Sequence, residues 1–122
     1  MLVSIVIPCY NSEQTIGKVV ELAIEEFEKL KDYECEFVLV NDYSRDNTWK
    51  SIHALTEKYP NVKGINLAKN FGQHNAIMAG MNYAQGELIL GMDDDMQNHP
   101  SQIPQFLDKM EEGYDIVFDH VE

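Results

Sequence analysis

The strongest constraint on the fold of this chain is a regular alternation of short apolar runs with longer segments of helical periodicity. The runs are rich in Val, Ile and Leu, which is typical of strands buried on both faces of a sheet. They lie at residues 2–7, 36–40, 62–68, 88–92 and 114–118. With short connections, this alternation predicts an α/β fold, in which a Rossmann-like parallel sheet with right-handed crossovers carries helices on both faces.

Four segments between the runs have the periodicity of amphipathic helices. The clearest is residues 16–27, for which Asn11 or Ser12 is the expected N-terminal cap. The other three are expected at residues 48–59, from after Gly72 up to Gly86, and at 101–110.

The length and the charge balance limit what the chain can bind. Its 122 residues suffice for one domain with a hydrophobic core, and 21 acidic against 9 basic residues give a formal net charge of −12. This charge argues against a nucleic-acid partner and against direct adhesion to anionic lipid, because cationic surfaces bind both. A phosphate compound bound here would need a metal ion to supply positive charge.

Cysteine usage and hydropathy bear on the cellular setting. Cys9 and Cys35 form no C-x-x-C pair, so we expect a reduced, cytoplasmic environment. No run approaches the ~20 apolar residues that cross a bilayer. We therefore expect any association with the cytoplasmic face of a membrane to come only through parts that are not in this chain.

Polar residues follow every predicted strand. They are Tyr10, Asn11, Asn41, Asp42, Lys69, Asn70, residues 93–97, Asp119 and His120. The carboxyl ends of parallel strands share one edge of the sheet, and ligands of open α/β sheets bind in the crevice outside that edge. The sequence thus predicts a ligand site there.

Three successive acids, Asp93, Asp94 and Asp95, continue directly from the fourth run. On an extended backbone Asp93 and Asp95 would project to one face and Asp94 to the other. Two carboxylates this close repel each other unless a cation lies between them. We therefore predict a Mg²⁺ or Mn²⁺ site formed by Asp93, Asp95 and Gln97. The alternative is an acidic turn exposed to solvent.

The diphosphate of a nucleotide sugar would suit such a site. Breaking the sugar–phosphate bond leaves negative charge on the departing diphosphate, which a divalent metal neutralises. Tyr10 offers a ring that can stack on a base, and Asp42 offers an acceptor for a base N–H or a ribose hydroxyl.

Four motifs in this order resemble the inverting family 2 glycosyltransferases of GT-A fold. They are VIPCYN at residues 6–11, VNDYSRDNT at 40–48, NFGQHNAIMAG at 70–80 and MDDDMQNHP at 92–100. The third motif and the D-x-D-x-Q ending look more narrowly like the branch that glycosylates polyprenyl phosphates such as dolichol or undecaprenyl phosphate.

The resemblance implies a role for each matching residue. Pro8, Tyr10 and Asp42 would contact the nucleoside, with Asn11 beside them in the donor site. Asp93 and Asp94 would lie along the ribose and diphosphate, and Asp95 with Gln97 would bind the metal. Two departures are present: residues 41–43 read Asn-Asp-Tyr where the family has an Asp pair and Gly, and residues 119–122 lack the family's basic residue.

The resemblance also concerns the extent of the chain. Family members continue with an acceptor-binding half, so residues 1–122 are expected to be the N-terminal donor-binding domain of a longer enzyme, inactive in turnover alone. The acceptor would be a lipid phosphate or a growing glycan. A phosphate acceptor is already anionic and needs little general-base help; a base, if one is used, is expected beyond Glu122.

Two other functions compete with this interpretation. One is a non-catalytic module that binds nucleotide sugars. The other is a receiver-type signalling domain, which would need an acid pair after the first strand and a phospho-accepting Asp after the third. The first run ends in Pro8-Cys9-Tyr10 and the third in Ala68-Lys69-Asn70, which disfavours the receiver.

Overall fold

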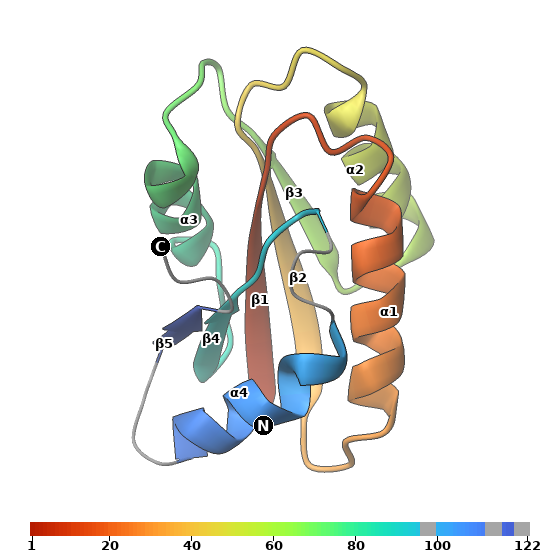
Figure 1. The fold of residues 1–122 in the computed structure, drawn as a ribbon, viewed down its shortest axis with the longest axis vertical. Helices are drawn as coiled ribbons and strands as arrows, with labels where there is room; N and C mark the ends of the chain where they lie inside the picture. The colour runs from red at the N-terminus through yellow and green to blue at the C-terminus, as the bar shows by residue number, and fades with distance from the viewer. Residues whose placement is uncertain (96–99, 112–115, 119–122) are drawn as a thin grey trace.

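A computed structural model of the chain describes residues 1–95, 100–111 and 116–118. Five parallel strands form one sheet in the order β3-β2-β1-β4-β5 (Figure 1). The strands are β1 (Leu2–Cys9), β2 (Glu34–Asn41), β3 (Val62–Asn66), β4 (Leu88–Gly91) and β5 (Ile116–Phe118). The helices are α1 (Ile16–Glu28), α2 (Thr48–Lys58), α3 (Gln73–Met81) and α4 (Ile103–Glu111), with a 3-10 turn, η1 (Pro100–Gln102), before α4.

Helices cover both faces of the sheet, as predicted. In Figure 1, α1 and α2 lie on one side of the strands and α3 on the other. The larger core joins the α1, α2 and α4 side to residues such as Ile5, Leu39 and Leu90. The smaller one packs Ala76 of α3 against Val6, Val38 and Val40. Alternate residues of β1 and β2 therefore face different cores, which explains why these strands read as continuous apolar runs.

The strand order rejects the receiver alternative. Receiver domains have the flavodoxin-like order 2-1-3-4-5, whereas this sheet follows the 3-2-1-4-5 order of dinucleotide-binding folds. In this order the direction of winding reverses between β1 and β4. The crevice outside the carboxyl ends of those two strands is therefore the expected ligand site.

The first strand is longer than predicted, because it continues through Pro8 to Cys9. The carbonyl of Val6 faces β4 and accepts the N–H of Met92 at 3.1 Å, so the backbone N of Pro8, two residues on, faces the same side. The pairing between β1 and β4 ends at Val6 and Gly91. The missing N–H of Pro8 therefore removes no hydrogen bond of the sheet.

Two local predictions were wrong. The cap of α1 is Thr15, not Asn11 or Ser12. Helix α3 ends at Met81, five residues before Gly86. Gly86 instead touches β1, where an added Cβ would lie 2.6 Å from the backbone N of Ser4. That glycine is needed for close approach of two backbones and not to end a helix.

Candidate functional site

A pocket of about 430 Å³ opens at the predicted crevice. Its lining comes from the carboxyl ends of four strands and from the segments that follow them: Pro8 and Cys9 at the end of β1 and Tyr10 just after it, Asp42 after β2, Asn70, Gly72 and Gln73 after β3, and Asp93, Asp94 and Asp95 after β4. Sequence reasoning placed Pro8, Tyr10, Asp42 and the three acids in one site, and the fold brings all six together. It did not predict Gly72 and Gln73 as site residues, although their position after the third strand indicates the same edge of the sheet.

The acidic loop does not continue the extended strand. Strand β4 ends at Gly91, and Asp94 and Asp95 lie in a bend. The expectation from an extended backbone, that Asp94 projects to the face opposite Asp93 and Asp95, was therefore wrong, because all three line the pocket. Its Oδ2 accepts the backbone N–H of Tyr10 at 2.9 Å, and its carbonyl accepts the Thr15 hydroxyl at 2.7 Å. This pair of bonds fixes the acidic loop against the loop after β1.

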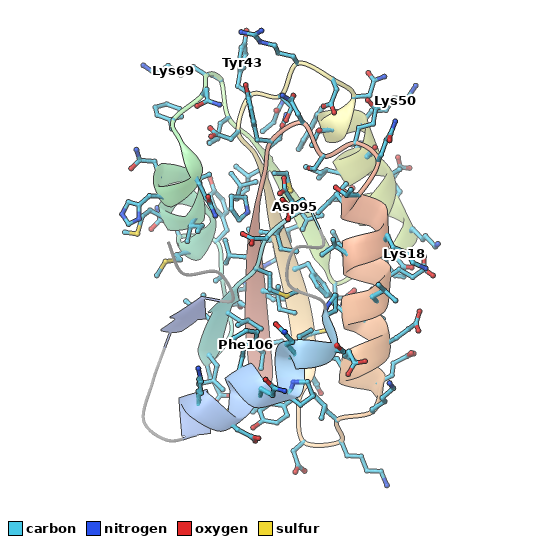
Figure 2. The ribbon with its side chains drawn as sticks, viewed as in Figure 1. Lys18, Tyr43, Lys50, Lys69, Asp95 and Phe106 are labelled. Carbon is cyan, nitrogen blue, oxygen red and sulfur yellow. The ribbon has the colours of Figure 1, made fainter. Side chains whose placement is uncertain are left out.

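The three acids differ in exposure and in charge environment. Asp93 is buried, Asp94 is half-buried and Asp95 is exposed. Figure 2 shows Asp95 near the middle of the molecule, between the strands and the upper part of α1. Burial, and then the charge of Asp95, raises the pKa of Asp94. Negative charge thus accumulates in the pocket, and a cation there would relieve it.

The donor atoms suit a hard divalent cation. Carboxylate oxygens are the ligands that Mg²⁺ and Mn²⁺ prefer, and Mg²⁺ is commonly held by one or two carboxylates together with the phosphates of a substrate. Within the ranges that the structure describes, no group of three or more His, Cys, Asp or Glu side chains could hold a metal ion. Asp93 and Asp95 suit a site of the kind in which two carboxylates hold the ion together with the phosphates of a substrate. Gln97 and residues 119–122 lie outside the described residues.

Asn11 lies at the site but not in the pocket wall. Its backbone has φ of 51°, in the left-handed region that Asn adopts more readily than most residues. Its N–H donates to Ser44 Oγ at 3.0 Å, and its Oδ1 accepts the N–H of Arg45 at 3.0 Å. Asn11 therefore ties the loop after β1 to the loop after β2.

The departure at residues 41–43 has a structural basis. The Oδ1 of buried Asn41 accepts the Ser44 N–H at 3.2 Å and the Ser44 hydroxyl at 2.6 Å, while its Nδ2 donates to Asn66 Oδ1 at 2.8 Å. An Asp at this position would have no N–H to donate to Asn66. Tyr43 takes φ of 55° and keeps 56% of its surface exposed. Tyr43 lies at the upper end of the molecule in Figure 2.

Cys9 has a packing role beneath the pocket. It is fully buried, and its thiol donates to the carbonyl of Ile7 at 3.4 Å. Burial, and then the charge of Asp94, raises its pKa. The thiol therefore stays protonated and is a poor nucleophile.

These features define an α/β domain of the nucleotide-binding type, with an acidic pocket at the reversal point of its sheet. Residues 4–122 match the family described as Glycosyl transferase family 2, and the chain belongs to that family.

Relatives and solved structures agree with this assignment. The chain is 43% identical over 116 residues to a protein of Proteus mirabilis named undecaprenyl-phosphate 4-deoxy-4-formamido-L-arabinose transferase, covering 94% of this chain and 35% of that protein. It thus spans about a third of that relative's length. A crystal structure of S. aureus TarS 1-349 in complex with UDP is 26% identical with a TM-score of 0.69, covering 92% of this chain and 32% of that one.

A mannosyltransferase of Pyrobaculum calidifontis, in complex with GDP-Man and Mn²⁺, shares the fold at 24% identity and a TM-score of 0.67, covering 76% of this chain and 27% of that one. The predicted GT-A class of fold is confirmed by these likenesses. Among the described residues, no helix has the length and apolar character that crossing a membrane requires.

Proposed function

We propose that the chain forms the donor-binding domain of an inverting glycosyltransferase that uses a nucleoside-diphosphate sugar. The observation that carries this proposal is the pocket at the end of β1 and β4, which is lined both by Tyr10, an exposed aromatic residue, and by Asp93, Asp94 and Asp95. An aromatic face binds a base, and carboxylates bind a metal-bound diphosphate.

The donor fits the pocket with its nucleoside toward β1 and β2. Pro8, Tyr10 and Asp42 line that side, and Asp93 and Asp94 lie on the β4 side, where ribose and diphosphate would follow. A cavity of about 430 Å³ falls in the usual size range of small-molecule sites. Asn11 contributes by fixing the loop that carries Tyr10.

Asp93, Asp95 and Gln97 would hold Mg²⁺ or Mn²⁺. When bound, the ion supplies positive charge to the departing diphosphate, which this acidic pocket would otherwise repel. Asp94 has a different task, because its carboxylate already accepts the Tyr10 N–H and holds the two sides of the pocket together.

The acceptor would be a polyprenyl phosphate. The name of the Proteus mirabilis relative specifies undecaprenyl phosphate, and the motifs at residues 70–80 and 92–97 resemble the same branch. An oxygen of the acceptor phosphate would attack the anomeric carbon from the face opposite the diphosphate, so that one C–O bond forms as the other breaks and the configuration inverts. That oxygen carries negative charge near neutral pH, so it needs no general base.

Calorimetric titration with UDP and GDP, with and without Mn²⁺, tests the proposal. We expect binding that depends on Mn²⁺, and a loss of roughly tenfold in affinity for Asp95→Asn. Asp108→Asn is the matched control, because Asp108 is an exposed acid on α4 outside the pocket. Absence of binding to both nucleotides in the presence of Mn²⁺ would contradict the proposed function.

A further inference from the structure

Both oxygens of the Asp42 carboxylate accept hydrogen bonds from one neighbouring segment. Its Oδ1 accepts the backbone N–H of Phe71 at 2.7 Å, and its Oδ2 accepts that of Gly72 at 2.9 Å. The backbone carbonyl of Asp42 also accepts the side-chain Nδ2 of Asn70 at 3.1 Å. Asp42 is 3% exposed. The end of β2 thus binds three successive residues of the loop after β3.

That loop has a conformation that its own sequence does little to stabilise. Gly72 has φ of 91° and ψ of 157° and precedes α3 without a side-chain cap of its own. Only glycine adopts this backbone region readily. The Asp42 carboxylate accepts the N–H groups of this N-cap residue and of Phe71 before it, and a negative charge near the N-terminus of a helix interacts favourably with the helix dipole.

The loop held in this way completes the pocket. Asn70, Gly72 and Gln73 all line it. Gln73, the first residue of α3, donates from Nε2 to Oδ1 of Asp93 at 3.4 Å. Strand β1 lies between β2 and β4 in the sheet. Residues 70–73 therefore connect the carboxylate just after β2 with a carboxylate after β4, and they do so in the wall of the pocket.

We propose that Asp42 is a positioning residue of the donor pocket. Its carboxylate holds residues 70–73 in the pocket wall and so sets Gln73 against Asp93 before any ligand binds. This role goes beyond a direct contact with the nucleoside. The identity of the ligand rests on the proposed function. The ordering of residues 70–73 in the ligand-free protein does not.

The substitution Asp42→Asn separates the two roles. An Asn side chain has one accepting oxygen, so its NH₂ group would face the second backbone N–H. In the ligand-free protein we expect amide hydrogen exchange at Phe71 and Gly72 to rise roughly tenfold or more, since charge-assisted bonds to both amides are weakened. Affinity for UDP or GDP with Mn²⁺ should fall about tenfold, because the pocket wall is no longer preorganised.

Gly72→Ala tests the same claim without changing Asp42. An added Cβ at residue 72 meets no atom within 4 Å, so the substitution acts through the backbone conformation alone. We expect the same direction of change in exchange at Phe71 and in nucleotide affinity. Gly17→Ala is the matched control, because a Cβ at Gly17 in α1 also meets no atom within 4 Å and the residue is outside the pocket; it should change neither quantity.

The outcomes are distinguishable. If Asp42→Asn weakens nucleotide binding but leaves exchange at Phe71 and Gly72 unchanged, Asp42 is only a ligand contact and the positioning role is wrong. If Asp42→Asn does not fold, an unchanged exchange rate at Phe71 in Gly72→Ala overturns the role, and a raised one supports it. If the unsubstituted protein binds neither nucleotide, the proposed function fails, and the exchange rates of the ligand-free variants still decide the positioning role.

Discussion

The backbone N–H of Tyr10 donates to Oδ2 of Asp94 at 2.9 Å, which joins the loops after β1 and β4 across the point where the winding of the sheet reverses. The bond brings Tyr10 and the acidic loop to one pocket although Tyr10 and Asp94 are 84 positions apart in the chain. The backbone at the proposed base-binding residue and the proposed diphosphate-binding loop are thereby held together.

Removing the ring of Tyr10 should weaken nucleotide binding without unfolding the protein. Tyr10 is 47% exposed and lies outside both hydrophobic cores, so Tyr10→Ala leaves the core packing intact, whereas base stacking on an aromatic side chain is worth about 1–3 kcal/mol. Calorimetry should show that loss with UDP or GDP. Tyr83→Ala is the control, because Tyr83 is 58% exposed and is not part of the pocket. Equal affinities for the two variants would contradict stacking on Tyr10.

Asp94→Asn should raise the midpoint of thermal unfolding at pH 7 and weaken donor binding. Burial and the charge of Asp95 raise the pKa of Asp94, so the charged carboxylate destabilises the folded state at neutral pH. An Asn keeps an acceptor for the Tyr10 N–H and carries no charge.

The pH dependence of that difference has a definite sign. A carboxyl with a raised pKa in the folded state binds its proton more readily there, so stability is gained as the pH falls through that pKa toward the ordinary value of 3.8. The advantage of Asp94→Asn over the wild type should therefore shrink on acidification, as followed by thermal melts between pH 7 and pH ~4. An advantage that grows on acidification would be inconsistent with the buried charge.

Glu36→Gln should destabilise the fold by about 1–3 kcal/mol without changing nucleotide affinity. Glu36 lies near the amino end of β2, and its Oε2 accepts the Ser4 hydroxyl at 2.5 Å and the Gln85 N–H at 2.6 Å. Lys63 Nζ lies 3.1 Å from its Oε1. Burial by itself raises the pKa of Glu36, but the bonds from Ser4 and Gln85 and the Lys63 charge outweigh it, so the pKa is lowered.

Urea denaturation checks this prediction at two pH values. A lowered carboxyl pKa contributes stability above the ordinary value of 4.5, and that contribution is lost as the pH falls through the folded pKa. The difference between wild type and Glu36→Gln should therefore be largest at neutral pH and small in acid. Glu57→Gln, on an acid whose side chain is 71% exposed, serves as the control and should change stability little at either pH.

Gly80→Ala should destabilise the protein by roughly 1–3 kcal/mol through overpacking. A Cβ at Gly80 would lie 2.5 Å from Val6 Cγ1 and 3.0 Å from Val40 Cγ2, so α3 would have to move away from the sheet. Thermal unfolding measures the loss. The same Gly17→Ala control should be neutral or slightly stabilising, as expected for Gly to Ala in a helix with open space. A loss no larger than in the control would contradict the packing of α3.

Local sequence patterns were sufficient to predict the helices and strands and the edge of the sheet at which the pocket lies. The apolar runs predicted the strands, and their order predicted that Tyr10, Asp42 and Asp93 would meet at one edge. The course of the acidic loop was not predictable in this way, because the position of Asp94 depends on bonds from Tyr10 and Thr15, far away in the chain. Period-2 alternation applies only while the strand continues.

Long-range hydrogen bonds also explain the other differences. Asn is a residue type that often caps helices, yet the side chain of Asn11 accepts a hydrogen bond from the backbone N–H of Arg45 on another loop. The hydrogen bonds of Asp42 to Phe71 and Gly72 leave no pattern in the local sequence, because they join residues that are 29 and 30 positions apart. Sequence reasoning named Asp42 for its acidity and could not foresee what its oxygens would bind.

The most direct test of the central claim is NMR line broadening by Mn²⁺ in the presence of UDP or GDP. Mn²⁺ is paramagnetic, so amide signals close to the bound ion are lost first. We expect early loss for Tyr10, Asp94 and Asp95, and retention for Glu36 and Lys63 at the other end of the strands. Broadening that spares the pocket, or that is the same at both ends of the sheet, would contradict a metal-assisted donor site.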